Sequence, residues 1–317
     1  MMEYVMQEEF LWSQKYRPNK IRDTILSDEL KKTFQQFVDQ DNIPNLLLTG
    51  SAGVGKTTVA KAMCDELGAD YIVINSSMNG NIDTLRTEIM QFASSISFAG
   101  GRKYVILDEA DYLNPQSTQP ALRNFMEEFS KNCGFILTCN FKNRIIEPLH
   151  SRCTVIDFKI KGQDKTRLAA QFYKRLCNIL TSEEVTFDNK VVAELVNLYF
   201  PDWRRIINEC QRYSATGAID SGILANFNQE SFKQLLTHMK AKDYKSVRKW
   251  VGENSDMDAT QFFRAFYDAA WEQVSENSVP GVVITLGEYQ YKHSFVADPE
   301  INIMAFLTAI MFEVSWK

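Results

Sequence analysis

The segment Gly50–Thr57 constrains the fold of this chain more than any other. It reads Gly-Ser-Ala-Gly-Val-Gly-Lys-Thr and fits the phosphate-loop pattern G-x-x-x-x-G-K-[ST]. The apolar run Leu46–Leu48 precedes it, and the helix-forming run Thr58–Met63 follows. In this strand-loop-helix order, glycines let backbone N–H groups converge on a phosphate chain, and the positive end of the helix favours the negative charge. The segment therefore predicts an α/β fold that binds a nucleoside triphosphate.

The side chains of this loop have distinct predicted roles. Lys56 is expected to reach the β and γ phosphates of ATP, and Thr57 to hold Mg²⁺. The residues expected to contact the nucleotide here are Gly50, Gly53, Val54, Gly55, Lys56, Thr57 and Thr58.

An acidic pair follows further along the chain. Tyr104–Leu107 are apolar and predict a buried parallel strand, and Asp108 and Glu109 come directly after them. Ligands bind at the carboxyl ends of strands in open α/β sheets, so both acids are expected near the phosphate loop. Asp108 is expected to contact Mg²⁺ through Thr57 or water. Glu109 is expected to polarise the water that attacks the γ phosphate, so the pair predicts ATP hydrolysis.

Length and charge limit the alternatives. The 317 residues exceed the usual length of one domain and indicate two or three. No apolar run is long enough to span a membrane, and Met1–Val5 lack the basic region and apolar core of a signal peptide, so a cytoplasmic protein is expected. The net charge of −5 excludes a generally basic surface, so any DNA contact must be local.

The cysteines and histidines do not form a metal-binding pattern. Six cysteines are scattered without C-x-x-C spacing, and most lie among apolar residues, which favours buried free thiols over disulfides or zinc ligands. The three histidines are far apart in sequence. No metal site is therefore expected on these residues.

Apolar strands alternate with helical patterns in the first half of the chain. The expected strands are Leu46–Thr49, Tyr71–Ile74, Tyr104–Asp108, Phe135–Cys139 and Val155–Phe158. Such alternation predicts a parallel five-stranded sheet covered by helices on both faces. Lys159–Asp164 break the pattern, and only helices are expected beyond them: Thr166–Leu180, Asp188–Tyr199, Asp202–Tyr213, a helix containing Phe232–Met239, Phe262–Val274 and Ile301–Trp316. The expected domains are an ATPase domain at 1–160, a helical lid at 161–228 and a helical collar at 229–317.

Four further motifs carry a family resemblance. Trp12–Pro18 read W-S-Q-K-Y-R-P, Asn140 ends the fourth expected strand, Ser151–Cys153 read S-R-C, and Pro201–Arg205 read P-D-W-R-R. Together with the phosphate loop and the acidic pair, they resemble the AAA+ ATPases, and more narrowly the clamp-loader ATPase subunits of the replication factor C type. Within that family, the length and the diverged collar are most similar to the large subunits of T-even-type bacteriophages. The resemblance covers roughly residues 10 to 215.

The resemblance implies roles for residues in these motifs. Tyr16 and Arg17 are expected to border the adenine pocket. Asn140 occupies the sensor 1 position, where an amide orients the attacking water. Arg152 would act in trans on the ATP of a neighbouring subunit. Arg204 is expected to be the sensor 2 arginine of the lid, with Arg205 as its competitor.

Two more segments resemble family elements that respond to DNA. Gln119–Glu127 are similar to the A-Q-x-A-L-R-x-x-M-E helix, in which the glutamine links DNA contact to the ATP site. Pro120 departs from that pattern and is expected in the first helical turn, with Ser117 or Thr118 as the cap. Gln119 is either a coupling residue or a structural one, and Arg123 either contacts DNA or supports the core. Ile82–Arg86 resemble the start of a helix that tracks template phosphates, which makes Arg86 a possible phosphate ligand.

The implied function is an ATPase subunit of a sliding-clamp loader, with ATP and Mg²⁺ as cofactors. Its implied partners are a sliding clamp, primer-template DNA, a small subunit, and copies of itself in a five-membered assembly of four large subunits and one small one. It would work in the cytoplasm, that of the host bacterium if it is phage-encoded. The alternatives are another AAA+ remodeller such as a branch-migration helicase subunit, a scaffold subunit that does not hydrolyse ATP, and a small-molecule kinase.

Overall fold

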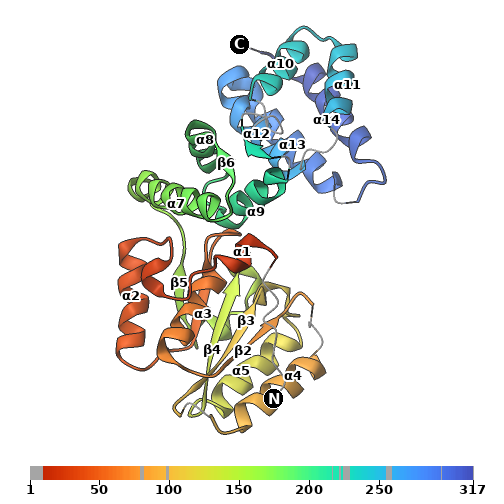
Figure 1. The fold of residues 1–317 in the computed structure, drawn as a ribbon. Helices are drawn as coiled ribbons and strands as arrows, with labels where there is room; N and C mark the ends of the chain where they lie inside the picture. Colours follow the sequence, from red (N-terminus) through yellow and green to blue (C-terminus); the bar gives the residue numbers. More distant parts are fainter. Residues whose placement is uncertain are drawn as a thin grey trace. The chain divides into compact units, whose positions relative to one another are not determined.

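The computed structural model describes residues 10–78, 82–97, 100–215, 217–220, 223, 229–254, 259–293 and 295–316. The chain divides into two compact units, Met1–Ile223 and Leu224–Lys317. The first contains a five-stranded sheet and the second is built from helices (Figure 1).

The central sheet consists of β1 (Leu46–Thr49), β2 (Tyr71–Asn75), β3 (Lys103–Asp108), β4 (Cys133–Cys139) and β5 (Thr154–Asp157). All pairs are parallel and the order is β2-β3-β4-β1-β5. The predicted five-stranded parallel sheet is confirmed. Because β4 lies between β3 and β1, the carboxyl ends of these three strands are neighbours, and the phosphate loop, the acidic pair and Asn140 all lie at these ends.

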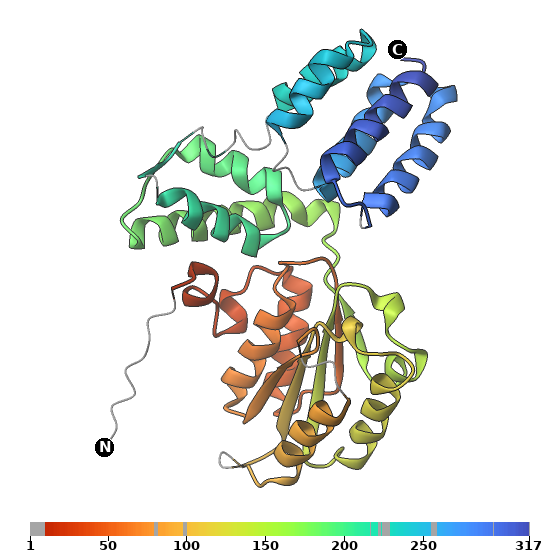
Figure 2. The same ribbon diagram turned by 90° about the vertical axis from the view of Figure 1, so that its right-hand side faces the viewer.

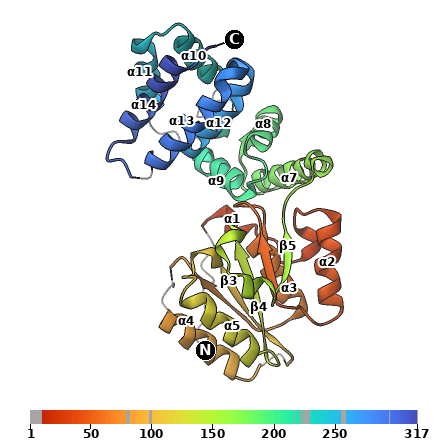
Figure 3. The same cartoon turned by 180° about the vertical axis from the view of Figure 1, so that it is seen from behind.

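Helices cover both faces of this sheet (Figures 1 and 3). One face packs on α2 (Asp28–Asp39) and α3 (Lys56–Leu67), and the other on α4 (Ile82–Ser94), α5 (Thr118–Glu128) and α6 (Glu147–His150). In β1, Leu46 and Leu48 belong to the first core and Leu47 to the second, as the alternation of strand side chains requires. The central strands β1, β3 and β4 are therefore apolar on both faces. The short elements of this part are α1 (Trp12–Lys15), η1 (Ile21–Asp23), η2 (Ala110–Tyr112) and η3 (Lys142–Arg144).

The rest of the first unit consists of α7 (Gly162–Ser182), α8 (Asn189–Tyr199), α9 (Trp203–Ser214) and a small parallel pair, β6 (Thr186–Phe187) and β7 (Ala218–Ile219). Only helices were predicted beyond residue 164, and the strand pair β6–β7 shows that this prediction was wrong. Strands of two residues are too short to show an alternation of apolar and polar side chains. Helix α7 also begins within the predicted break, at Gly162. Asp188 and Asp202 cap α8 and α9 by accepting hydrogen bonds from backbone N–H groups. We call this part the lid.

The second unit contains α10 (Gln229–Lys240), α11 (Tyr244–Glu253), α12 (Ala259–Gln273), η5 (Glu276–Ser278), α13 (Val279–His293) and α14 (Pro299–Glu313), seen from another side in Figure 2. Its core combines aliphatic residues with an aromatic cluster, in which Phe306 packs edge-on against Phe262, Phe263 and Phe266. Helices α11 and α13 were not predicted. The predicted helix Ile301–Trp316 was too long, because Val314 is extended and Trp316 forms an antiparallel bridge with Val274.

All six cysteines are free, as predicted, and Cys64, Cys133, Cys139 and Cys210 are buried. Burial raises the pKa of Cys64 to about 12, so this thiol is protonated at neutral pH. No helix in the described part of the chain is long and apolar enough to cross a membrane.

Candidate nucleotide-binding and hydrolysis site

Two glycines of the phosphate loop adopt backbone conformations that other residues rarely adopt. Gly53 and Gly55 adopt positive φ values of 72° and 98°, a region that favours glycine. Gly55 is also the N-cap of α3, and no side chain caps that helix. The first N–H groups of α3 therefore remain available to bind an anion.

Lys56 reaches back across this loop. Its Nζ donates hydrogen bonds to Gly50 O at 2.8 Å, to Ser51 O at 2.7 Å and to Asn140 Oδ1 at 2.8 Å. Burial lowers the pKa of Lys56 from its usual value. Phosphate oxygens near the ammonium group would favour its charged form.

The acidic pair lies beside the loop, as predicted. Thr57 Oγ1 donates a hydrogen bond to Asp108 Oδ1 at 2.5 Å, which joins α3 to the end of β3. This hydroxyl and carboxylate are hard oxygen ligands of the kind that Mg²⁺ prefers, so the two residues fit the metal. Glu109 follows with a left-handed backbone, φ 58° and ψ 43°, and is partly buried. Both carboxylates thus lie at the edge of the sheet where the loop begins.

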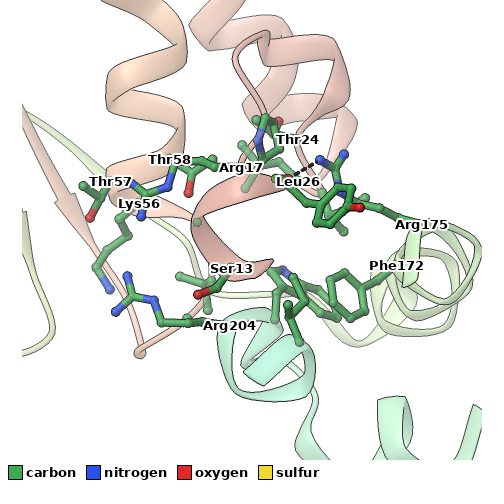
Figure 4. A pocket seen from close by; sticks show the side chains of 18 residues that line it. Ser13, Arg17, Thr24, Leu26, Lys56, Thr57, Thr58, Phe172, Arg175 and Arg204 are labelled. Atoms are coloured by element: carbon green, nitrogen blue, oxygen red, sulfur yellow. Dashed lines mark hydrogen bonds between the residues drawn. The ribbon is translucent and has the colours of Figure 1, made fainter. Parts of the chain in front are cut away.

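A pocket extends from the loop to the lid (Figure 4). At one end, Lys56 and Arg204 approach each other, and the charge of Arg204 contributes to the lowered pKa of Lys56. Elsewhere the lining is mostly apolar: Pro18, Ile25, Leu26, Val54, Phe172, Trp203 and Ile207. Tyr16, Arg17 and Thr58 also line the pocket, as predicted. A cationic end and an apolar wall suit a polyphosphate attached to a flat base.

The structure distinguishes the two candidate lid arginines. Arg204 lines the pocket, whereas the guanidinium of Arg205 lies over the ring of Tyr199, 4.4 Å from its centroid. The first arginine of the motif therefore lines the pocket, and the second does not.

The N-terminal segment is tied to the lid by residues that sequence reasoning missed. Arg175 of α7 donates hydrogen bonds to Tyr16 O at 2.7 Å and to Asp23 O at 2.8 Å. Glu183 accepts from the Tyr16 hydroxyl at 2.5 Å and pairs with Lys15 at 2.8 Å. These contacts join residues more than 150 positions apart, so no local pattern could have revealed them. They fix the segment that borders the apolar part of the pocket.

Comparisons with known proteins identify the family of this chain. A model of the ATPase family associated with various cellular activities (AAA) matches residues 46–160. A model of the sliding-clamp-loader large subunit, AAA+ ATPase lid domain, matches residues 164–225. The chain is 35% identical to the sliding-clamp-loader large subunit of Enterobacteria phage T4 over 318 residues, with 99% of each chain covered. It belongs to the family of sliding-clamp-loader large subunits.

More distant relatives extend the comparison. The replication factor C small subunit of Halobacterium salinarum is 32% identical to this chain, with 95% of each covered. A point mutant of RuvB from Thermotoga maritima has a TM-score of 0.53 at 14% identity, covering 74% of this chain and 86% of that one. The RuvB likeness shows the fold alone. The AAA+ fold predicted from the motifs is confirmed, and this clamp-loader family member is an ATP hydrolase.

Asn140 follows β4 and contacts the phosphate loop. Besides the contact of its side chain with Lys56, its backbone N–H and that of Phe141 donate to Asp111 Oδ2 at 3.3 and 3.1 Å. Asp111 is 5% exposed and was not predicted to have a role. It anchors the turn after β4 to the segment that follows the acidic pair.

Arg152 does not line the pocket of its own chain. It precedes the edge strand β5 and is partly exposed, with Nε donating to Glu127 Oε1 at 2.9 Å and Nη1 to Pro148 O at 2.9 Å. This ion pair lowers the pKa of Glu127. The guanidinium of this clamp-loader subunit is therefore held near the edge strand β5, outside the pocket of its own chain.

Gln119 is fully buried at the start of α5. Its Nε2 donates to Leu113 O at 3.0 Å and to Arg144 O at 2.9 Å, and its Oε1 accepts from Ile146 N at 2.8 Å. It joins the segment after the acidic pair to the segment after Asn140. Pro120 falls in the first turn, as predicted, where its missing N–H is not needed.

Two predictions, the cap of α5 and the role of Arg123, need correction. Ser117 occupies the N-cap position of α5 but makes no capping bond; Asn114 Oδ1 instead accepts from the N–H groups of Gln116 and Ser117. Arg123 is exposed, so the alternative that it supports the core was wrong. Arg86 is exposed on α4, while the side chains of residues 82–84 lie outside the described residues.

Proposed function

We propose that this chain is the ATP-hydrolysing subunit of a clamp loader that opens a sliding clamp and places it on primer-template DNA during replication. Likeness to the phage clamp-loader large subunits over nearly the whole chain carries the proposal. Two contacts beside the pocket support it, Lys56 with Asn140 and Thr57 with Asp108, because a scaffold subunit that only binds nucleotide has no need of Asn140 or of the acidic pair.

Each side chain has a part in the proposed reaction. Lys56 and Arg204 neutralise the phosphates at the cationic end of the pocket. Thr57 and Asp108 would hold Mg²⁺, which would supply further charge stabilisation of the phosphates. Glu109 polarises the attacking water, and Asn140 orients it. Phosphoryl transfer is mostly positioning and charge stabilisation, so this arrangement suffices for hydrolysis once the remaining positive charge is supplied.

Arg152 supplies that charge to a neighbour's ATP. It lies outside its own pocket and is already held in one orientation by Glu127 and Pro148. An arginine donated in trans is worth about 10³ to 10⁵ in rate in comparable phosphoryl transfers, which makes hydrolysis depend on assembly.

We further propose the composition of the complex. Four copies of this chain and one small subunit would form a five-membered assembly, with parts at 1–160, 161–228 and 229–317 acting as ATPase domain, lid and collar. Arg86 and Arg123 would contact DNA phosphates, independently of sequence, and Gln119 would transmit DNA contact to the ATP site. The phage relatives lead us to infer the cytoplasm of a bacterial host as the compartment.

Steady-state ATP hydrolysis by the chain, purified with its co-expressed small subunit, tests the function. We expect strong stimulation only when primer-template DNA and the cognate sliding clamp are both present. Turnover that ignores the clamp would indicate a helicase-like remodeller instead. No turnover under any condition would indicate a scaffold subunit.

A further inference from the structure

Thr138 is a buried polar residue in an otherwise apolar strand. It lies in β4 directly after Phe135, Ile136 and Leu137 and is 1% exposed. A buried hydroxyl without a hydrogen-bonding partner is unfavourable, so the partners of the Thr138 hydroxyl indicate what it contributes.

Both partners of this hydroxyl belong to the acidic pair. Thr138 Oγ1 donates a hydrogen bond to Asp108 Oδ1 at 2.6 Å and accepts one from the backbone N–H of Glu109 at 3.1 Å. The last paired residues of β3 and β4 are Leu107 and Leu137, so Asp108 and Thr138 each come directly after the paired part of these two strands. One hydroxyl thus contacts two consecutive acids that have different chemical tasks.

The first contact fixes the carboxylate of Asp108. Its Oδ1 accepts hydrogen bonds from two hydroxyls, that of Thr57 at 2.5 Å and that of Thr138 at 2.6 Å. Thr57 belongs to α3 and Thr138 to β4, so the carboxylate is held from two separate elements. Such outer contacts keep a metal-binding carboxylate in one orientation.

The second contact fixes the backbone of Glu109. A φ of 58° is a left-handed conformation, which is unfavourable for a residue with a side chain. The hydrogen bond from the Glu109 N–H to Thr138 supports that conformation, and this backbone determines the direction in which the Glu109 side chain leaves the strand.

We propose that Thr138 is a positioning residue for ATP hydrolysis, holding Asp108 toward the metal and Glu109 toward the attacking water through one hydroxyl. This inference rests on the proposed roles of the two acids. It assigns no contact with the nucleotide to Thr138 itself.

Thr138→Val and Thr138→Ser separate the hydroxyl from the packing of the side chain. Val keeps the branched shape and lacks the hydroxyl, whereas Ser keeps the hydroxyl. In the complex with the small subunit, clamp and DNA, we expect Thr138→Val to lower kcat by about 10- to 100-fold with little change in KM for ATP. We expect Thr138→Ser to restore most of the lost rate.

A binding measurement gives a second readout that does not depend on turnover. Calorimetric titration with ADP should give the same Kd for wild type and Thr138→Val without Mg²⁺. When the Mg²⁺ concentration is varied, the Thr138→Val variant should need about tenfold more Mg²⁺ than wild type for the same gain in affinity for ADP. A structural role alone would lower the thermal midpoint without changing the metal dependence. If Thr138→Val does not fold, Thr138→Cys is the alternative, because its thiol is a weak hydrogen-bond donor. It should show smaller changes of the same kind in kcat and in the dependence on Mg²⁺.

Wild-type kcat and metal dependence in Thr138→Val would overturn the inference, as would a Thr138→Ser variant as slow as Thr138→Val. Absence of ATP hydrolysis in the wild type would instead overturn the proposed function, so the two failures are distinguishable.

Discussion

Lys56 Nζ donates a hydrogen bond to Asn140 Oδ1 at 2.8 Å, although the two residues are 84 positions apart in the chain. The contact joins the phosphate loop after β1 to the turn after β4, two neighbouring strands of the sheet. It places the amide of Asn140 next to the ammonium group that is expected to meet the γ phosphate. A phosphate group bound at Lys56 would therefore lie close to the turn after β4.

Asn140→Ala should leave ATP binding nearly unchanged and lower kcat by about 100-fold, because one polar group that positions or stabilises the reacting atoms is lost. Asn140→Asp keeps an oxygen near Lys56 but cannot donate a hydrogen bond, so we expect it to be comparably slow. Single-turnover hydrolysis and nucleotide titration measure the two effects. A fast Asn140→Asp variant would show that the amide donor is not needed.

Glu109→Gln should retain ATP binding and lose turnover by at least about 100-fold, because the amide cannot polarise water as a carboxylate does. Glu128→Gln, at an exposed position of α5, is the matched control and should behave as wild type. Steady-state hydrolysis with DNA and clamp gives the comparison. Normal turnover by Glu109→Gln would remove this residue from its role.

Arg152→Ala should bind ATP but lose the DNA-stimulated hydrolysis of the assembled complex, by about 10³-fold or more. Mixing it with a Lys56→Ala subunit that retains Arg152 should restore part of the rate if the arginine acts in trans. Arg212→Ala, which also removes an exposed arginine from an ion pair, is the control. Full activity of Arg152→Ala alone would contradict the assignment.

Gln119→Leu should destabilise the chain by about 2–3 kcal/mol, because Leu113 O, Arg144 O and Ile146 N lose their partner in a buried place. If Gln119 couples DNA contact to the ATP site, DNA-stimulated hydrolysis should fall much more than hydrolysis without DNA. Urea unfolding and the two rates measure these effects. Equal loss of both rates would indicate a structural role only.

Glu183→Gln should loosen the N-terminal segment from the lid. The hydrogen bonds from Lys15 and Tyr16 lower the pKa of Glu183 below its ordinary 4.5, so this carboxylate stabilises the fold above pH 4.5 and loses that contribution as pH falls through the lowered value. Since the pair of Lys15 and Glu183 is partly exposed, we expect the substitution to lower the free energy of unfolding by about 1 kcal/mol at pH 7. Urea unfolding of both proteins should show the difference shrinking below pH 4.5. A difference in unfolding free energy that does not change with pH would contradict this contribution of the Glu183 carboxylate.

Sequence patterns predicted the elements whose signals are local. The strands β1 to β5 have apolar runs, α9 has Asp202 at its start, and Pro120 could stand only in a first turn. Helices α11 and α13 and the pair β6–β7 were missed. The two strands of that pair hold only two residues each and are stabilised by a segment distant in sequence, so local pattern could not indicate them.

By itself, the sequence determined the phosphate cradle and the acidic pair, because both depend on local geometry: glycines that adopt positive φ, a helix N-terminus, and two acids at the end of a buried strand. Only the tertiary structure decided that Arg204 and not Arg205 lines the pocket, that Arg152 lies outside it, and that Thr138 holds both acids. The direction of a side chain depends on the elements packed around it, and those elements come from distant parts of the chain.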